Sequence, residues 1–290
     1  MLYLTSLALF AAAASPAVSD EACNAPAGAA ELLANTPAPI ILLGELHGTN
    51  EAPAAADAFV CLALARGETV VLALERTVDE QPLYDAYIAS DGGEAAQRMI
   101  VSGERWMTPF QDGRSSAAML DLIERTRQRI ADGAALSLRA VDRGEPDADL
   151  DDLPQPRNQA MSRRLQALAE DADRVIMIVG SVHAQRNQAR FGDRVLETNG
   201  SLTPREAFHA INLVAGSGES WNCQLGEDGQ PSCAVHPTRS ETTGDPRVLN
   251  ADEIAANSYL AARLDDYDSF VYLGPSSGSP PAYRAFDDLE

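Results

Sequence analysis

Short apolar runs alternate along the chain with longer segments in which apolar residues recur at helical spacing. Runs that are apolar at nearly every position are typical of strands buried on both faces of a parallel sheet. The pattern predicts such strands at 38–43, 69–74, 136–141, 174–179, 207–214 and 269–273. It predicts helices at 51–66, 80–90, 115–132 and 157–169, with Ser115 as the N-cap of the third. This order of elements predicts an α/β fold with a mainly parallel sheet flanked by helices.

The C-terminal region is less regular than the rest of the chain. Residues 216–246 are rich in Gly, Ser, Thr and Pro, which predicts an elaboration of one α/β domain from about 216. Four cysteines without C-x-x-C spacing are typical of disulfides, and they allow three pairings. We favour Cys223 with Cys233, which bracket a Gly-Glu-Asp-Gly turn typical of a hairpin, and Cys23 with Cys61. Buried free thiols are the alternative.

The first 19 residues contain no charged side chain and carry an apolar run that precedes the small residues Ala17, Val18 and Ser19. This pattern is typical of a secretory signal peptide, and the apolar run is too short to span a bilayer. We therefore predict a signal peptide at 1–19, a mature domain at 20–290 without a membrane span, and a periplasmic or secreted location. A buried N-terminal helix is the alternative, because no Lys or Arg precedes the apolar run.

Composition and charge narrow the class of protein. The chain of 290 residues is 45% hydrophobic and 22% charged, which is ordinary for a globular protein. Acidic residues outnumber basic ones 43 to 22, so the formal net charge is -21. Such a field repels phosphate backbones and anionic lipid surfaces, so nucleic acid is not an expected partner. The composition does not indicate whether the protein is a monomer or an oligomer.

Titratable side chains follow four of the predicted strands. In open α/β sheets, ligands bind beyond the carboxyl ends of the strands, so residues placed there are the first candidates for a site. They are Glu45 and His47 after the first strand, Glu75 after the second, Asp142 after the third and His183 after the fourth. Two imidazoles and three carboxylates on one rim are the groups from which metal sites and acid/base pairs are built.

Two kinds of chemistry are open to this set of residues. His47 and His183, with Glu45 or Glu75, can hold a divalent transition metal such as Mn, Co or Zn, which lowers the pKa of a bound water. The carboxylate that is not a ligand then serves as the base. Without a metal, His47 itself can take a proton from water while a carboxylate orients its ring. The spacing of the residues does not separate the two schemes.

The same residues carry a resemblance to a known superfamily. Gly44-Glu45-Leu46-His47 with Glu51 one turn on, Glu75, and Gly180-Ser181-Val182-His183 resemble the paired G-x-x-H motifs of the ChaN/Tiki/erythromycin-esterase superfamily. Arg157-Asn158 followed by Met161 resembles the Arg-containing helix that precedes the second motif in that group. The resemblance extends over residues 39–196, and the haem-binding ChaN-like proteins are the nearest group.

The resemblance implies an α/β fold with the site at the strand ends. It implies that Glu45, His47, Glu75 and His183 are the catalytic residues and that Arg157 holds a substrate or a carboxylate. Members of the superfamily include haem-binding uptake proteins, metal-dependent peptidases and esterases that open macrolide rings. The superfamily therefore implies a site without fixing its substrate.

A polar loop at 111–116, which follows Trp106, is similar to a subgroup of exported ChaN-like proteins. We expect Arg114 of this loop to enter the cleft and bind an anion, because a guanidinium fork suits a carboxylate, with Trp106 as an apolar wall. A helix cap with a surface salt bridge is the alternative. The expected substrate-binding set is therefore Arg157, Arg114, Asp142 and Trp106.

The leading hypothesis is an exported, metal-dependent hydrolase that cleaves a peptide, ester or lactone bond in a small molecule or peptide. The competing hypothesis is a non-catalytic haem-binding protein for haem or iron uptake. In that case Tyr84, Tyr87 or a cleft histidine would serve as the axial ligand. A scaffold without activity is the third possibility.

Overall fold

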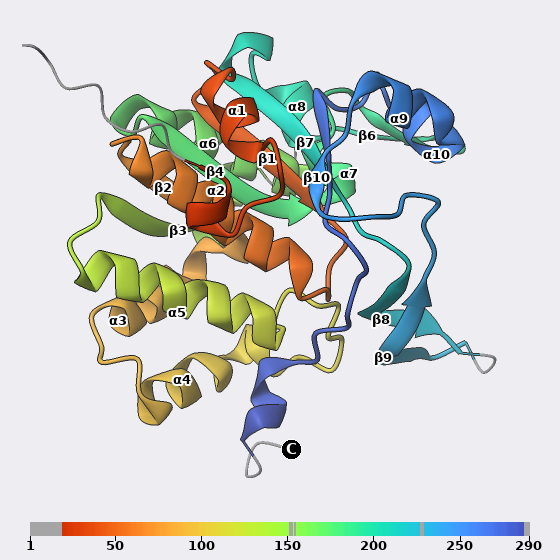
Figure 1. The fold of residues 1–290 in the computed structure, drawn as a ribbon. Helices are drawn as coiled ribbons and strands as arrows, with labels where there is room; N and C mark the ends of the chain where they lie inside the picture. The colour runs from red at the N-terminus through yellow and green to blue at the C-terminus, as the bar shows by residue number, and fades with distance from the viewer. Residues whose placement is uncertain (1–18, 151–152, 154, 227–228, 287–290) are drawn as a thin grey trace, which may run out of the picture.

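A seven-stranded sheet forms the centre of the molecule, in the order β10-β11-β7-β1-β4-β2-β3 (Figure 1). The computed structural model describes residues 19–150, 153, 155–226 and 229–286, so the predicted signal peptide lies outside the described residues except for Ser19. The strands are β1 (Ile40–Glu45), β2 (Val70–Thr77), β3 (Leu136–Asp142), β4 (Arg174–Gly180), β7 (Phe208–Val214), β10 (Arg247–Val248) and β11 (Ser269–Tyr272). The six predicted strands all run parallel, and β10 runs antiparallel to β11. The predicted mainly parallel sheet is confirmed.

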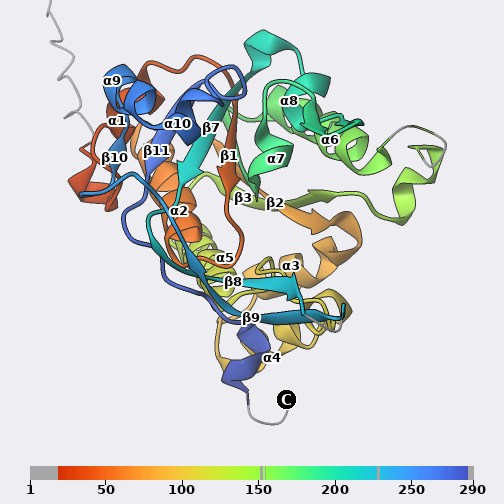
Figure 2. The same cartoon turned by 90° about the vertical axis from the view of Figure 1, so that its right-hand side faces the viewer.

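Helices cover both faces of the sheet (Figure 1, Figure 2). One face packs through residues such as Leu43 and Phe59 against α1 (Ala29–Ala34), α2 (Glu51–Ala65), α3 (Gln81–Ile88), α4 (Glu94–Val101) and α5 (Ala117–Ala131). The other face packs through residues such as Leu42 and Met161 against α6 (Pro156–Asp171), α7 (Ser181–Ala184), α9 (Ala251–Ala256) and α10 (Ser258–Ala261). The short α8 (Asn199–Leu202) lies against α6. The four predicted helices are confirmed as α2, α3, α5 and α6.

The N-cap of α5 is Ser116, one residue after the predicted Ser115. Ser116 Oγ accepts a hydrogen bond from the backbone N–H of Met119 at 3.4 Å. The Ser115 hydroxyl is engaged elsewhere, because Nη1 of the buried Arg76 donates to Ser115 Oγ at 2.7 Å. A tertiary partner from the end of β2 therefore moves the cap by one residue.

Two hairpins lie outside the central sheet. They are formed by β5 (Ala189–Phe191) with β6 (Arg194–Leu196), and by β8 (Gly218–Leu225) with β9 (Pro231–Thr238). Cys223 lies opposite Cys233 across β8 and β9 and is bonded to it, so the predicted disulfide hairpin is confirmed. A second disulfide joins Cys23 to Cys61 of α2, as favoured from the sequence. The described part of the chain holds no free cysteine.

The β8–β9 hairpin crosses the two loops that carry His47 and Arg114. The Trp221 backbone N–H donates to Gly48 O at 2.8 Å, and Trp221 Nε1 donates to Gln111 O at 2.8 Å. Gly48 and Gly113 both have positive φ, and a Cβ at Gly48 would lie 1.9 Å from Trp221 O. A Cβ at Gly113 would lie 2.3 Å from Gly48 N. Only glycine permits this crossing, so the backbones of three distant segments meet directly behind the site.

The segment 277–282 ties together the starts of α2 and α5. Ser279 N–H donates to Gly48 O at 2.8 Å, and Asn50 N–H donates to Ser277 O at 3.0 Å. At α5, Ala117 N–H donates to Pro280 O at 2.8 Å. These backbone bonds hold the loop after β1 against the start of α5 without help from the central sheet.

The strand order brings the carboxyl ends of β1 and β4 together. These strands are neighbours, but the chain leaves β1 toward β2 on one side and leaves β4 toward β7 on the other. Each connection passes the other strand on its way to the next one, and α2 and α7 pack on opposite faces of the sheet. His47 follows β1 and His183 follows β4, so the two G-x-x-H motifs lie at neighbouring strand ends, where open α/β sheets bind ligands. Among the helices of the described residues, none combines the length and apolar character needed to cross a bilayer.

Candidate functional site

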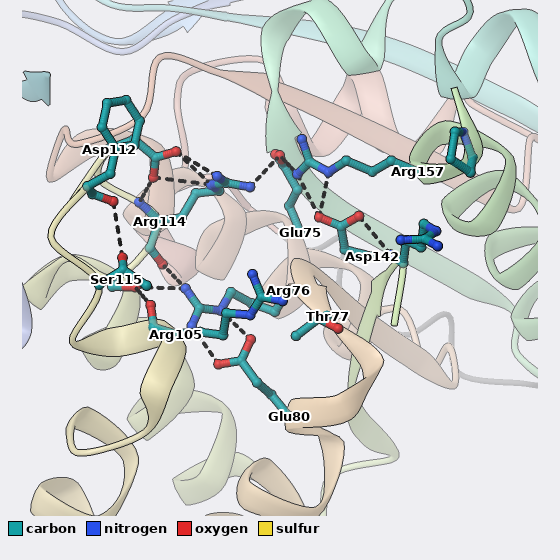
Figure 3. Close-up of a pocket in the computed structure, with 14 residues that line it drawn as sticks. Glu75, Arg76, Thr77, Glu80, Arg105, Asp112, Arg114, Ser115, Asp142 and Arg157 are labelled. Atoms are coloured by element: carbon teal, nitrogen blue, oxygen red, sulfur yellow. Dashed lines mark hydrogen bonds and ion pairs between the residues drawn. The ribbon is translucent and has the colours of Figure 1, made fainter. Parts of the chain in front are cut away.

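The predicted site residues meet around the carboxylate of Glu75 at the end of β2. Glu75 Oε2 accepts the backbone N–H of Gly180 at 2.7 Å and lies 3.6 Å from His47 Nε2. Glu75 Oε1 accepts from Arg114 Nη1 at 3.3 Å and from Arg157 Nη2. Figure 3 shows Glu75 between the two arginines. Strand ends that are distant in the sequence are therefore joined by one buried carboxylate.

The imidazole of His47 lies between two buried carboxylates. Its Nδ1 is 2.9 Å from Glu45 Oε1 and its Nε2 is 3.6 Å from Glu75 Oε2. Burial opposes protonation, but the two carboxylates outweigh it and raise the pKa of His47 to about 9. A raised pKa favours the imidazolium form of His47 at neutral pH, in which Nδ1 donates to Glu45 and Nε2 faces Glu75 without reaching hydrogen-bond distance.

The carboxyl group of Glu75 is the anionic centre of the site. Burial alone would favour its neutral form, but the imidazolium of His47 and the two guanidinium groups around it outweigh burial. They lower the pKa of Glu75 to about 2. Glu75 therefore stays ionised at neutral pH, and its oxygens already have four donor groups around them.

His183 lies in a different environment from His47. Asn158 Nδ2 donates to Glu197 O at 2.5 Å, which turns Asn158 Oδ1 toward His183 Nδ1 at 2.8 Å. An amide oxygen only accepts, so His183 Nδ1 carries the proton. Nε2 is then left with a lone pair, which lies 3.4 Å from Arg157 Nη1. Burial also lowers the pKa of His183, so this ring is neutral where His47 is charged.

Two arginines border the site, each held by its own aspartate. Arg157 Nε donates to Asp142 Oδ2 at 2.6 Å, and Arg114 Nη2 donates to Asp112 Oδ2 at 2.6 Å. Burial opposes ionisation of Asp112, but Arg114 outweighs it and lowers the pKa of that carboxyl. Both arginines keep about a third of their side-chain surface exposed, at 31% for Arg114 and 34% for Arg157. They are thus oriented by the protein but reachable by a ligand.

A polar cavity of about 470 Å³ opens beside the Glu75 cluster (Figure 3). Its wall includes Glu75, Asp142 and both arginines, together with Arg76, Thr77, Glu80, Arg105, Thr108, Phe110, Asp112, Ser115, Arg143 and Pro156. Trp106, expected as an apolar wall, does not line this cavity. It is 1% exposed and lies beneath Arg76, whose guanidinium carbon is 5.0 Å from the indole centroid. The aromatic side chain that lines the cavity is Phe110.

The two tyrosines considered as haem ligands lie in the apolar core. Tyr84 and Tyr87 are fully buried, and neither lines the cavity beside Glu75, which we call the arginine-rich cavity after the arginines in its wall. Tyr87 donates to Glu124 Oε2 at 2.7 Å, and the Tyr84 hydroxyl lies 3.4 Å from Glu80 Oε1. A cleft histidine is the remaining axial ligand that the sequence offered.

The residues expected to hold a divalent metal do not fit one as they are arranged. Within the described residues, no group of three His, Cys, Asp or Glu side chains is placed to hold a metal ion. Their lone pairs already have donors, because His47 carries protons toward both carboxylates and His183 Nε2 faces a guanidinium. The metal centre stays a prediction.

The site contains residues that the sequence analysis did not assign. Asn158 was noted only within a motif, although its position next to Arg157 on a helix was the available signal. Asp112 directly precedes the Gly113-Arg114 pair, and an acidic residue two positions from a cleft arginine is a reasonable candidate for its partner. No signal in the sequence pointed to Arg105.

Three solved structures have a similar fold. A protein from Bacillus cereus has 11% identity and a TM-score of 0.56, over 87% of this chain and 91% of that chain. An erythromycin esterase mutant in its open conformation has 11% identity and a TM-score of 0.57, over 87% and 97%. A succinoglycan biosynthesis protein has 10% identity and a TM-score of 0.54, over 86% and 91%. No family model and no curated protein matches the sequence. At this identity the likeness concerns the fold: the chain has the α/β architecture of an erythromycin esterase, one of the groups that its paired G-x-x-H motifs resemble.

Proposed function

We propose that this protein is an exported hydrolase of ester, lactone or peptide bonds in which His183 is the general base and His47 the general acid. The observation that carries the proposal is the contrast between the two rings. His47 has a carboxylate at each nitrogen, whereas His183 has an amide oxygen at one nitrogen and a guanidinium near the other. An acid and a base held in opposite protonation states at neighbouring strand ends are what hydrolysis at neutral pH requires.

The course of the proposed reaction follows from the protonation states of His47 and His183. A water molecule attacks the substrate carbonyl carbon and gives a proton to His183 Nε2, while Asn158 holds the ring in the tautomer that leaves Nε2 unprotonated. Arg157, whose Nη1 faces Nε2 at 3.4 Å, turns to the substrate in this step. His47 Nε2–H gives its proton to the departing oxygen or nitrogen as the scissile bond breaks. The products are a carboxylic acid and an alcohol or amine, and exchange with solvent restores both rings. The pKa directions of the two histidines agree with these roles.

The carboxylates and arginines support the two histidines. Glu45 and Glu75 keep His47 charged, and Glu75 also fixes the position of both arginines. Arg114 and Arg157 bind the substrate and stabilise the oxyanion that forms during attack, because preorganised donors act most strongly on developing charge. Asp142 orients Arg157, and Trp106 supports the cavity wall from beneath through Arg76.

The same experiment tests three alternative functions. The metal-dependent hydrolase predicted from the sequence would need His47 to lose a proton and the arginines to release Glu75. A haem-binding role would use a cleft histidine as the axial ligand. The third is a scaffold without activity.

Export is supported by the two disulfides, which persist in oxidising compartments.

The test is hydrolysis of p-nitrophenyl esters, lactones and peptide p-nitroanilides by the purified protein and by His183→Ala and His47→Ala. Each substitution should lower kcat/KM about a hundredfold or more, because general acid or base catalysis contributes on that order. His209→Ala is the matched control, since His209 lies on β7 with its Nε2 2.8 Å from Ser269 Oγ. It should leave the rate within about twofold.

All proteins are assayed with chelator and again with Mn²⁺, Co²⁺ or Zn²⁺ added. A chelator-resistant rate supports the proposal, and a rate that returns only with metal establishes the metal-dependent form instead. No hydrolysis by the unmodified protein in any arm refutes a hydrolase of these bonds. A shift of the haem Soret band that is lost in both variants would then establish the haem-binding role.

A further inference from the structure

The wall of the arginine-rich cavity contains four carboxylates, and each one already has an arginine partner. Glu75 is paired with Arg114 and Arg157, and these two arginines also hold Asp112 and Asp142. The fourth carboxylate, Glu80, accepts from Nη2 and Nε of Arg76 at 2.5 and 3.1 Å, as Figure 3 shows. Each acidic side chain of the wall is thus paired within the wall, with three arginines shared among four carboxylates.

Besides Arg143, which has an interaction of its own, this pairing leaves over one cavity arginine, Arg105. It is exposed and lines the cavity, and its guanidinium has no hydrogen-bond or ion-pair partner among the described residues. Two adjoining hollows that Arg105 also borders contain the acidic side chains of Asp79 and Glu145. Neither carboxylate pairs with it, and Asp79 instead accepts the backbone N–H of Glu145 at 3.1 Å.

The backbone that carries Arg105 is fixed although its side chain is free. Arg105 belongs to the short helical turn Glu104–Trp106, and its carbonyl oxygen accepts from Ser115 Oγ at 3.2 Å. The next residue, Trp106, is buried beneath the cavity. An arginine on a rigid segment loses less conformational entropy when it binds than one on a mobile loop does.

An unpaired guanidinium in this place is notable because the chain as a whole has a net charge of -21. The local positive charge therefore does not reflect a basic composition. A planar guanidinium fork matches the oxygen pair of a carboxylate or the oxygens of a phosphate. Neither histidine lines the cavity, but each lies against a residue that does: His47 Nε2 is 3.6 Å from Glu75 Oε2, and His183 Nε2 is 3.4 Å from Arg157 Nη1. A ligand with an oxyanion at Arg105 can therefore extend toward them past Glu75 and Arg157.

We infer that Arg105 binds an oxyanion, a carboxylate or a phosphate, on a part of the substrate other than the scissile bond. This inference rests on the proposed function for the identity of the ligand as a substrate, and it selects anionic esters, lactones or peptides over neutral ones. Arg114 and Arg157 then act at the reacting carbonyl, while Arg105 selects the substrate class.

Binding is measured first, because it does not depend on catalysis. Isothermal titration of the full protein with inorganic phosphate and, separately, with glutarate should show saturable binding that weakens as salt rises. Arg105→Ala should weaken the binding about tenfold or more, which is the scale of one charge-assisted hydrogen bond, and Arg105→Lys should restore part of it. Arg190→Ala is the matched control, since Arg190 is another exposed arginine without a partner among the described residues. The tighter of the two ligands identifies the oxyanion.

Kinetics with two esters of equal acyl length complete the test. Arg105→Ala should raise KM about tenfold for the p-nitrophenyl half-ester of glutaric acid and leave KM for p-nitrophenyl pentanoate unchanged. Anion binding that Arg105→Ala leaves intact, or no binding by the unmodified protein, overturns the inference. Binding that depends on Arg105, in a protein that hydrolyses neither ester, upholds the anion site and counts against the proposed function instead.

Discussion

Replacing Glu45 with glutamine removes one of the two charges that hold the proton on His47. The pKa of about 9, compared with an ordinary 6.5, corresponds to about 3 kcal/mol of net stabilisation of the imidazolium. A carboxylate whose oxygen is 2.9 Å from the ring nitrogen contributes roughly 6 kcal/mol at an effective dielectric constant of about 20. This contribution exceeds the net value, so burial should prevail in the variant. We therefore expect the pKa of His47 in Glu45→Gln to fall below 6.5.

Two measurements follow this change. The chemical shift of the His47 Cε1 proton against pH gives the pKa directly. If His47 is the general acid, the alkaline limb of the pH profile of kcat/KM should lie near pH 9 in the unmodified protein and move to lower pH in the variant. Glu94→Gln is the control, because Glu94 is 76% exposed on α4 and should leave the alkaline limb in place.

The pH dependence of the unfolding free energy is a second measurement, and the raised pKa of His47 fixes its sign. The folded pKa of His47 lies above its unfolded value, so its contribution of about 3 kcal/mol is fully present below pH 6.5. That contribution is lost as pH rises from 6.5 through about 9. The unfolding free energy of Glu45→Gln should lack this dependence in urea titrations. A His47 pKa at or below 6.5 in the unmodified protein would refute the reasoning.

Three further predictions concern geometry and stability. Gly180→Ala should lower kcat with little change in melting temperature, because the new Cβ would lie 2.9 Å from His47 Nε2 and displace the ring. Removing the Cys23–Cys61 disulfide should cost about 1 kcal/mol more unfolding free energy than removing Cys223–Cys233, because it closes 38 residues of chain instead of 10. Arg174→Ala should cost roughly 3 kcal/mol, because it leaves two buried carbonyl oxygens and a paired carboxylate without their donor.

Each of these predictions has a contradicting result. Normal kcat in Gly180→Ala would show that His47 does not need its present position. Equal losses from serine pairs at the two disulfides, measured by urea denaturation, would show that loop length does not govern their effect. For Arg174, the control is Arg163→Ala on the exposed face of α6. A loss no larger than that of the control would show that the buried arginine network is not stabilising.

The strands and long helices could be predicted because their signals are local. Six apolar runs form the parallel sheet, and the residue types at their ends identified Glu45, Glu75 and His183. The edge strand β10 has only two residues, which is too short for a periodic pattern. The N-cap of α5 could not be assigned correctly, because the choice depends on Arg76, a side chain from another strand.

The roles of the site residues depend on contacts that the sequence does not record. Whether His183 or His47 carries the extra proton is decided by Asn158 and by two carboxylates placed through the fold. Likewise, the sequence indicated Arg114 through its polar loop but gave no sign of the different environments of Arg114 and Arg105. Arg114 is paired with Asp112 and Glu75, and the pairing with Glu75 requires the strand ends to have met.

The tie between residues 277–282 and the loop after β1 has a consequence for the order in which the site forms. Glu51 accepts from Ser277 across a separation of 226 residues, and Gly48 O accepts from Ser279 in the same segment. During synthesis, the loop that carries His47 therefore emerges long before the residues that hold it. A chain interrupted before residue 277 retains every strand of the sheet and the bond from Trp221 N–H to Gly48 O, but it lacks the bonds that Ser277 and Ser279 make to that loop. Proteolytic removal of this segment should abolish the proposed hydrolytic activity while the central sheet stays folded.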